Sequence, residues 1–145
     1  MDGLLDSAVA IARLSPFHHR RRPELAEQQR MLHRMDLATR NLRVVVRRVD
    51  FMVADGRPRP ELAGLLADLA TAVQALGDSV PRPQHVNAAR YGLLGVAGRL
   101  DPRRVLPDAA LGEAMLVVML RPLLVDLLAA TGMSDAEARA SLPRL

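Results

Sequence analysis

The stretch DAALGEAMLVVMLRPLLVDLLAAT, residues 108–131, decides the fold because it is apolar on every side. At about 100° per residue, its internal charges Glu113, Arg121 and Asp126 are spread around a helix and leave no polar face. These charges and Pro122 also interrupt the stretch before it reaches the roughly 20 apolar residues that a membrane span requires. We therefore predict a helix buried at the centre of a soluble domain, with other helices packed around it.

Two of these charges, Arg121 and Asp126, are candidate buried structural charges. An unpaired buried charge costs far more than a paired one, and side chains five residues apart on a helix point in different directions. Each is therefore expected to have a partner on another helix. Pro122 removes one backbone donor, so we also predict a kink close to it.

Helical periodicity extends over most of the remaining chain. The pattern predicts an N-terminal helix over 1–15, a basic connector over 16–23, a long helix over 24–55, and helices over 60–76 and 86–100. A capping box of Ser134 and Glu137 marks a short last helix. We predict an all-α fold in a single domain over 1–145. It is an antiparallel helical bundle of about five helices, built from residues 24–145, with one long spine helix and a short C-terminal helix.

The long helix is expected to be the spine of the domain, with a length of about 45 Å. Its seam residues recur at alternating spacings of three and four, as in a coiled coil. They are Leu32, Met35, Thr39, Leu42, Val46, Val49 and Val53. Because the turn at 56–60 is short, we expect the helix over 60–76 to lie antiparallel beside the spine. The helix over 86–100 contains Gly92, Gly95 and Gly98. These glycines lower the stability of the helix unless they permit close packing against another helix.

The formal net charge of +4 comes from one short segment. Residues 13–22 hold four of the 20 basic residues, all of them arginine, and no acid, whereas the other 16 balance 16 Asp and Glu. These four are Arg13, Arg20, Arg21 and Arg22. They form a candidate lipid-facing basic patch, since basic clusters attract anionic lipid headgroups by about 1 kcal/mol per charge. An exposed basic loop without a partner is an equally good interpretation.

The sequence offers little support for an active site. The absence of Cys excludes zinc–thiolate sites and thiol nucleophiles, and an aromatic content of 2% leaves few rings for stacking bases or sugars. The His residues lack metal-ligand spacing, the Ser residues lie in no nucleophile motif, and no glycine-rich phosphate loop is present. We therefore predict no enzyme activity, no metal site and no cofactor.

A stripe of arginines on the long helix is suited to contact phosphates. Its members are Arg30, Arg34, Arg40, Arg43, Arg47 and Arg48. Asp36 and Asp50 lie about one turn from members of this stripe and can neutralise them on a solvated face. We prefer this second interpretation, so nucleic acid is not the expected partner. A small helical nucleic-acid-binding regulator is kept as the alternative function.

Three segments of the chain resemble a known family. They are Asn41 to Arg48, the helix that begins with Pro60 and Glu61, and a run from Arg121 through Asp126, Leu127, Leu128, Thr131 and Gly132 to Glu137. Together they resemble the soluble C-terminal helical domain of actinobacterial proteins in the fusaric acid resistance or aromatic acid exporter family. The resemblance covers most of residues 24–141, and Ala129 stands where the family more often has Arg.

This resemblance implies a noncatalytic cytoplasmic domain of a membrane efflux protein, with a role in assembly, regulation or gating. It implies a location on the cytoplasmic side of the inner (plasma) membrane, although the chain by itself is expected to be soluble. The implied partner is the protein's own membrane domain, and anionic lipid headgroups and a homo-oligomer are further expected partners. No catalytic or substrate-binding residue of the family maps to this chain.

Overall fold

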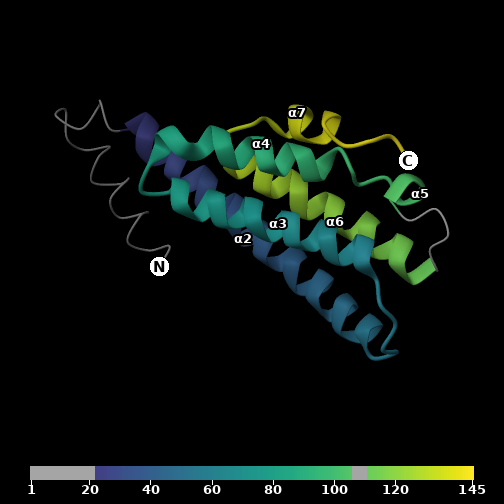
Figure 1. Ribbon diagram of the computed structural model, residues 1–145. Helices are drawn as coiled ribbons and strands as arrows, with labels where there is room; N and C mark the ends of the chain where they lie inside the picture. Colours follow the sequence, from purple (N-terminus) through teal and green to yellow (C-terminus); the bar gives the residue numbers. More distant parts are fainter. Residues whose placement is uncertain (1–21, 106–110) are drawn as a thin grey trace.

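The computed structural model describes residues 22–105 and 111–145, where all regular structure is helical (Figure 1). The elements are α2 (Arg22–Val53), α3 (Pro60–Ser79), the 3-10 turn η2 (Pro83–His85), α4 (Val86–Ala97), α5 (Pro102–Val105), α6 (Leu111–Ala130) and α7 (Asp135–Ala140). The predicted all-α bundle, with one long helix and a short C-terminal helix, is confirmed. The predicted helix over 1–15 and most of the connector over 16–23 lie outside the described residues.

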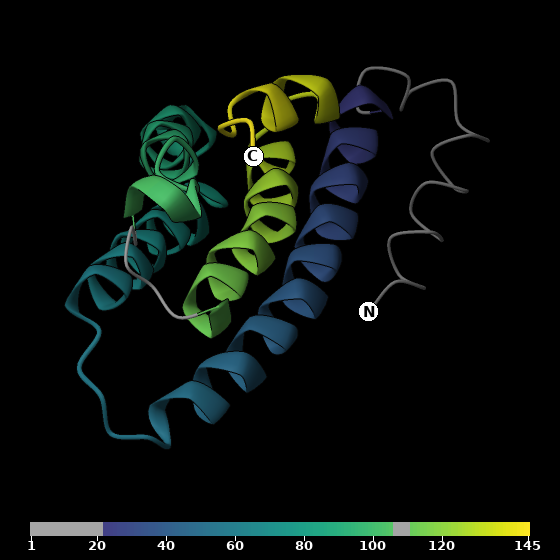
Figure 2. The ribbon, with the colours of Figure 1, turned by 90° about the vertical axis from the view of Figure 1, so that its right-hand side faces the viewer.

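Helix α6 occupies the centre of the molecule, between two outer layers (Figure 2). Helix α2 packs along one side of α6, while α4, which is paired with α3, packs on the other. Ten of the 20 residues of α6 are buried, because it has no polar face to turn to solvent. The short helices α5 and α7 also pack on α6. The prediction of a central buried helix is therefore confirmed.

The expectation that α3 lies beside the spine helix α2 is wrong. Helix α3 packs on α4, and α2 packs chiefly on α6. A helix that is apolar on all sides has to be covered from several directions, so α6 lies between α2 and the α3–α4 pair. The connection over 54–59 permits this arrangement, because six extended residues span about 20 Å.

The face that α2 buries is rotated by one residue from the predicted seam. The line that faces α6 is made of Met31, Arg34, Ala38, Asn41, Val45, Arg48 and Met52. Met35 and Val49 of the predicted seam are half-buried beside this line and pack against the core. Leu42 and Val46 of the predicted seam are instead 45% and 56% exposed. The reason is Asp126 of α6, which faces α2 and would be unpaired against a stripe of Leu and Val. The observed register places Arg34 and Asn41 opposite this carboxylate.

The ends of the helices follow the signals in the sequence. Gly56 after α2 and Gly132 after α6 have φ values of 68° and 91°, a left-handed conformation that glycine adopts without strain. Pro60 begins α3, where its missing N–H is not needed. Ser134 and Glu137 form both hydrogen bonds of the predicted capping box.

One of the three glycines of the 86–100 segment permits a close helix contact. A Cβ at Gly92 would lie 3.2 Å from the Cβ of Ala72 on α3, whereas a Cβ at Gly95 would meet nothing within 4 Å. Gly98 follows the last residue of α4. Pro122 lies inside α6, which continues through it, and the kink near this residue stays a prediction.

Candidate functional site

The buried carboxylate of Asp126 and its partner Arg34 lie where three helices meet. Only 8% of this residue is exposed. Its Oδ2 accepts a hydrogen bond from Asn41 Nδ2 at 2.7 Å, and its Oδ1 lies 3.6 Å from Arg34 Nη1. Arg34 also places Nη2 2.6 Å from Oδ1 of Asp135, at the start of α7. Asp126 thus has partners on α2, and Arg34 holds α2 against both α6 and α7.

Arg121 lies on a different side of α6 and is half-buried. Its Nη1 donates to the carbonyl of Leu100 at 2.8 Å, and its Nη2 donates to the carbonyl of Pro143 at 2.7 Å. Its partners are therefore backbone oxygens of the chain after α4 and of the C-terminal tail. Arg121 and Asp126 do not come together, and each holds a different part of the chain on α6.

The turn after α6 receives a third polar contact, from α4. Arg90 donates from Nε to Thr131 Oγ1 at 3.1 Å and from Nη2 to the Thr131 carbonyl. Thr131 is buried, and its hydroxyl donates to the carbonyl of Leu128 at 2.6 Å. The Thr131–Gly132 pair that carries part of the family resemblance is therefore the point where α4 contacts the end of α6.

A groove of about 880 Å³ opens between the first half of α2, the segment from Ser79 to Val86, and the α6–α7 turn. Apolar side chains such as Met31 and Val80 line it together with charges of both signs, among them Arg30 and Glu27. Sequence reasoning did not find this groove, because it is formed by three segments that are far apart in the chain. The mixture of signs favours no single class of ionic ligand.

Asp55, Arg59 and Glu113 form an ion cluster at the other end of α2, which the sequence analysis did not predict. Arg59 places Nη2 2.6 Å from Asp55 Oδ2 and Nε 2.8 Å from Glu113 Oε1, so it ties the α2–α3 turn to the start of α6. The hydrogen bonds from the Arg59 guanidinium and the Arg57 backbone hold the pKa of Asp55 well below its usual range. The two carboxylates, Asp55 first, raise the pKa of Arg59. The spacing of Asp55 and Arg59 at i, i+4 is a signal for half of this cluster.

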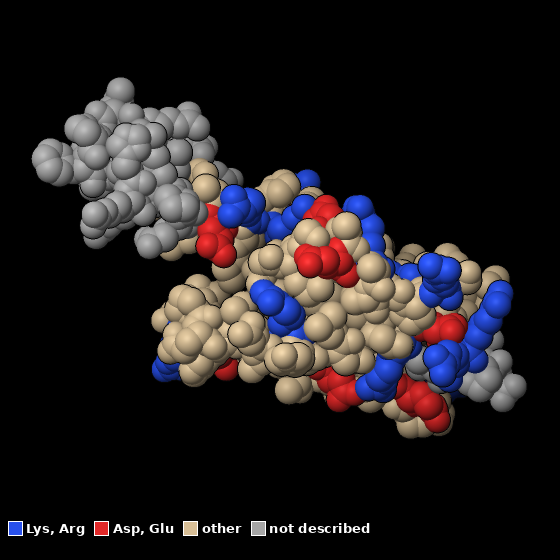
Figure 3. All heavy atoms as spheres, turned by 90° about the horizontal axis from the view of Figure 1, so that it is seen from above, with Lys and Arg blue, Asp and Glu red and all other residues tan. Residues whose placement is uncertain are grey.

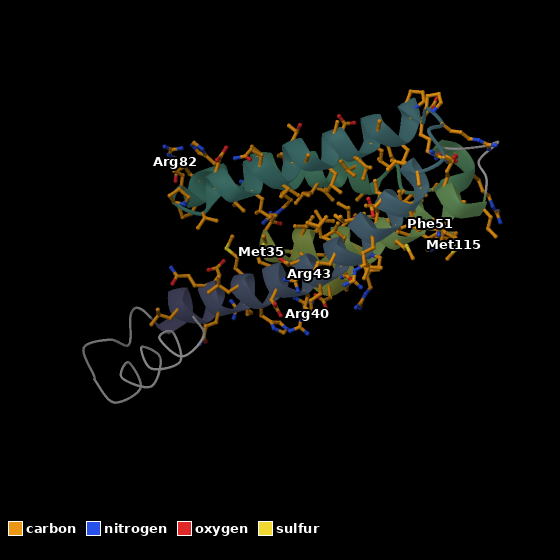
Figure 4. All side chains as sticks on the ribbon, turned by 90° about the horizontal axis from the view of Figure 1, so that it is seen from below. Met35, Arg40, Arg43, Phe51, Arg82 and Met115 are labelled. Atoms are coloured by element: carbon orange, nitrogen blue, oxygen red, sulfur yellow. The ribbon has the colours of Figure 1, made fainter. Side chains whose placement is uncertain are left out.

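The arginine stripe of α2 divides into inward and outward members. Arg34 and Arg48 point toward α6, where Arg34 is paired with acids. Arg40 and Arg43 lie exposed along the outer edge of α2 (Figure 4), and Arg40 Nη2 pairs with Asp36 at 2.7 Å. Seen from above, arginines and acids are interspersed over the surface (Figure 3). Local neutralisation therefore occurs for Arg40, as the sequence predicts.

An exposed apolar surface extends over α2 and α6, which we call the α2–α6 face. Its exposed apolar members are Val44 and Phe51 of α2 and Leu111, Met115 and Pro122 of α6, and half-buried Leu37 borders them. The exposed residues Arg40 and Arg47 lie one turn from Val44 on α2. Val44, Phe51, Leu111 and Met115 are 51%, 73%, 80% and 44% exposed. Figure 4 shows Phe51 and Met115 near each other, where α2 ends and α6 begins. These exposed apolar side chains make the α2–α6 face a candidate contact surface.

The candidate basic patch is largely outside the structure. Arg13, Arg20 and Arg21 lie outside the described residues, and Arg22 is the first residue of α2. Over residues 22–105 and 111–145, no three His, Asp or Glu side chains converge as metal ligands do. No helix of this part of the chain is long and apolar enough to cross a membrane.

Comparison with known proteins leaves the family open. No family model, no curated protein and no solved structure matches this chain.

Proposed function

We propose that this chain is a noncatalytic helical interaction domain, the cytoplasmic domain of a membrane efflux protein with a role in assembly, regulation or gating. The α2–α6 face is the observation that supports this proposal most directly, because four of its apolar side chains are at least 44% exposed in a chain with a well-formed core. Its partner in the proposal is the rest of the transporter.

The polar residues Arg121 and Asp126 of α6, and Thr131 directly after it, are engaged in contacts within the bundle. Asp126 is paired with Asn41 and Arg34, Arg121 with two backbone carbonyls, and Thr131 with Arg90. These side chains therefore connect helices, as expected for residues that hold a bundle together. They include residues of the 121–137 segment, which carries the most specific part of the resemblance to the exporter family.

The reading frame that encodes this chain tests the proposed membrane context. Several hydrophobic spans encoded upstream of residue 1 in the same frame are expected, because the family places its membrane helices before this domain. A native frame without such spans contradicts the proposal.

Liposome cosedimentation tests the proposed lipid contact at the N-terminal junction. Replacing Arg20, Arg21 and Arg22 together by Gln is expected to leave folding unchanged and to reduce binding to vesicles that contain anionic lipid. The matched control replaces Arg82, Arg103 and Arg104, which are exposed elsewhere, and removes the same charge. Equal losses in the two triple variants, or no loss in either, contradict a specific junction patch.

The alternative, a nucleic-acid-binding regulator, is favoured by one observation. Arg40 and Arg43 share the outer edge of α2 (Figure 4), and Arg47 is also exposed. Titration of duplex DNA at several salt concentrations distinguishes the two functions, because phosphate contacts by three arginines produce a steep loss of affinity with salt. We expect no such binding, because Arg40 is already paired with Asp36.

A further inference from the structure

Apolar and basic side chains share one side of α2 on the α2–α6 face. Val44 and Phe51 are seven residues apart, as are Arg40 and Arg47, so each pair lies on a line along the helix. At about 100° per residue, Phe51 and both arginines lie within about 60° of Val44 around the helix axis. Of the acids of α2, Asp36 lies closest to this sector, about 80° from Val44. The exposed apolar side chains of this sector are therefore accompanied by cations of their own helix and by none of its acids.

The charge of this stretch of α2 is only partly neutralised. Residues 36–51 contain four arginines and two aspartates, a net charge of +2. Arg40 Nη2 pairs with Asp36 at 2.7 Å. Arg43 and Arg47 are exposed, and neither has an acid partner in the part of the chain that the structure describes. Guanidinium groups without a protein partner are available to the phosphates and carboxylates of another molecule.

Helix α6 extends the face with apolar side chains, and its own charges are paired. Leu111, Met115 and Pro122 share one side of α6, because they are separated by four and seven residues. The three charged residues of α6 are buried or half-buried, and each has a partner within the bundle. Phe51 and Met115 lie near each other where α2 ends and α6 begins (Figure 4). The two helices therefore present one surface, and its charge comes from the arginines of α2.

Arg48 lies beside Phe51 without a counter-charge. Its guanidinium carbon is 5.8 Å from the centre of the Phe51 ring, and a Cβ at Gly112 would lie 2.7 Å from its Nη2. Its Nε is buried and has no hydrogen-bond partner among the described residues. The other half-buried arginines of the described residues all have partners, and they are Arg34, Arg59, Arg90 and Arg121. A cation that the fold leaves unpaired beside an exposed ring adds to the positive potential of this face.

We propose that the α2–α6 face lies on the surface of an anionic lipid bilayer. In this arrangement Phe51, Leu111 and Met115 lie at the boundary of headgroups and acyl chains, while Arg43 and Arg47 pair with anionic headgroups. A basic helix with exposed apolar side chains on the same side is typical of helices that lie in this interface. The apolar and basic residues recur along α2 over about 10 Å, so the axes of α2 and α6 are expected to lie parallel to the bilayer.

The two kinds of side chain together favour lipid over nucleic acid. Duplex DNA offers phosphates to the arginines of α2 but little apolar surface to Leu111 and Met115. A bilayer interface offers both anionic groups and hydrocarbon. The inference rests on the proposed function, and it extends the partner of this face from the transporter to the lipid that surrounds it.

A single introduced tryptophan tests whether this face enters the bilayer interface. The chain has no Trp, so the emission of one substitution reports only its own surroundings. With vesicles of phosphatidylcholine and phosphatidylserine, the emission of Phe51→Trp is expected to shift to shorter wavelength and to be quenched by brominated lipid. Tyr91→Trp is the matched control, because Tyr91 is 75% exposed on α4, and its emission is expected to stay unchanged. Vesicles of phosphatidylcholine alone are expected to shift neither.

Vesicle cosedimentation of charge variants tests the role of the arginines. Replacing Arg43 and Arg47 together by Gln is expected to raise the Kd for the anionic vesicles by about 25-fold, at about fivefold per charge near the surface. The matched control replaces Arg82 and Arg139 by Gln and removes the same charge. Arg82 lies at the other end of the molecule from Phe51 (Figure 4), and Arg139 lies on α7. This control is expected to change the Kd by less than about threefold, because distant charges are screened by salt.

A change at Leu111 tests the apolar contact separately from the charge. Leu111→Gln is expected to raise the Kd for the anionic vesicles by about tenfold, because it removes apolar area from the contact. Leu111 is 80% exposed, so this variant is expected to keep the circular dichroism of the wild type. An unchanged Kd would contradict the insertion of this face.

The outcomes separate this proposal from its alternatives. A chain that does not bind the anionic vesicles overturns it. Binding that leaves the emission of Phe51→Trp unchanged also overturns it, because another surface, such as the N-terminal junction, would then carry the contact. Equal losses in the two double arginine variants would show attraction without a defined face. If the change at Arg43 and Arg47 abolishes binding to duplex DNA and leaves vesicle binding intact, the nucleic-acid alternative is favoured instead. The reading-frame test is independent of these results, so either proposal can fail alone.

Discussion

At the scale of single residues, the bundle is held in register by a few polar side chains within an apolar core. Asp126 is the clearest case, because it is buried and its two oxygens meet an amide and a guanidinium from α2. Such contacts add little net stability, yet they make every other register costly. The one-residue rotation of α2 relative to its own apolar pattern follows from this carboxylate.

Removing the carboxylate should be clearly destabilising. Asp126→Ala leaves the half-buried Asn41 amide without its acceptor and opens a small cavity, while Arg34 keeps Asp135. We expect a loss of about 2–3 kcal/mol in the free energy of unfolding, measured by urea denaturation. Asp68→Ala is the control, because its ion pair with Arg99 is exposed and is expected to contribute less than about 1 kcal/mol. Equal losses at the two sites would contradict a special role for Asp126.

The pKa of Asp55 gives the bundle a defined dependence on pH. Because the folded pKa is below the unfolded value of about 4, the stabilisation is fully present above that value and is lost as the pH falls toward the folded pKa. Wild type is therefore expected to lose stability more steeply than Asp55→Asn on acidification. The difference between the urea midpoints of the two proteins should therefore become smaller between neutral pH and about pH 3. Parallel curves would contradict this assignment.

Individual partners were only in part predictable from the sequence. The spacing of Arg121 and Asp126 on a helix without a polar face predicts that they are not paired with each other, and the structure places their partners on other elements. The identity of these partners depends on tertiary contacts between residues as distant as Asn41 and Asp126. The carbonyl partners of Arg121 carry no sequence signal at all, because every residue has a carbonyl.

At the scale of helices, the sequence predicted correctly which segments are helical and about where each helix ends. It predicted less well which side of each helix is buried. The stripe on α3 buries Leu62, Leu65, Leu69 and Leu76, as its spacing predicts. On α2, two apolar stripes lie side by side, and periodicity alone does not show which one faces α6. The α2–α6 face is built from the residues left outside on both helices, so it is visible only once the helices are packed.

Substitutions at two glycines of α4 measure separately how helix propensity and helix packing contribute to stability. Gly95→Leu is expected to stabilise the protein by up to about 1 kcal/mol, because its side chain enters open space and leucine is the better helix former. Gly92→Leu is expected to destabilise it by about 1–3 kcal/mol, because its Cβ already lies 3.2 Å from Ala72. Thermal unfolding of the two variants measures both effects. A gain at both positions would show that α3 and α4 are not in close contact at Gly92.

At the scale of the whole molecule, the order of layers is α2, then α6 with α7, then α4 with α3 (Figure 2). Helix α6 is the element that both outer layers share, and α2 packs chiefly on α6 although a short turn joins it to α3. The sequence predicted the central position of α6 from its composition. It did not predict which helices are neighbours, because a connection of six residues is compatible with either arrangement.

The central position of α6 predicts that α6 is locally more stable than the outer helix α2. Amides of residues 116–128 in α6 are expected to exchange most slowly with solvent, since their opening requires separation of both layers. Amides of α2 are expected to exchange faster, because α2 packs chiefly on one neighbour. Hydrogen exchange followed by mass spectrometry or NMR measures this order. Slower exchange in α2 than in α6 would contradict the layered description.

The position of α6 after α2, α3 and α4 in the sequence has a consequence for biosynthesis. The ribosome completes α2, α3 and α4 before it makes α6, the helix that separates α2 from the α3–α4 pair. Until then, the apolar side of α2 has no native surface to cover it, and a nascent chain that is stalled or truncated before residue 130 lacks the shared centre of the domain. Chaperone capture of such unfinished chains is therefore expected to be strongest at this stage and to end once α6 has emerged.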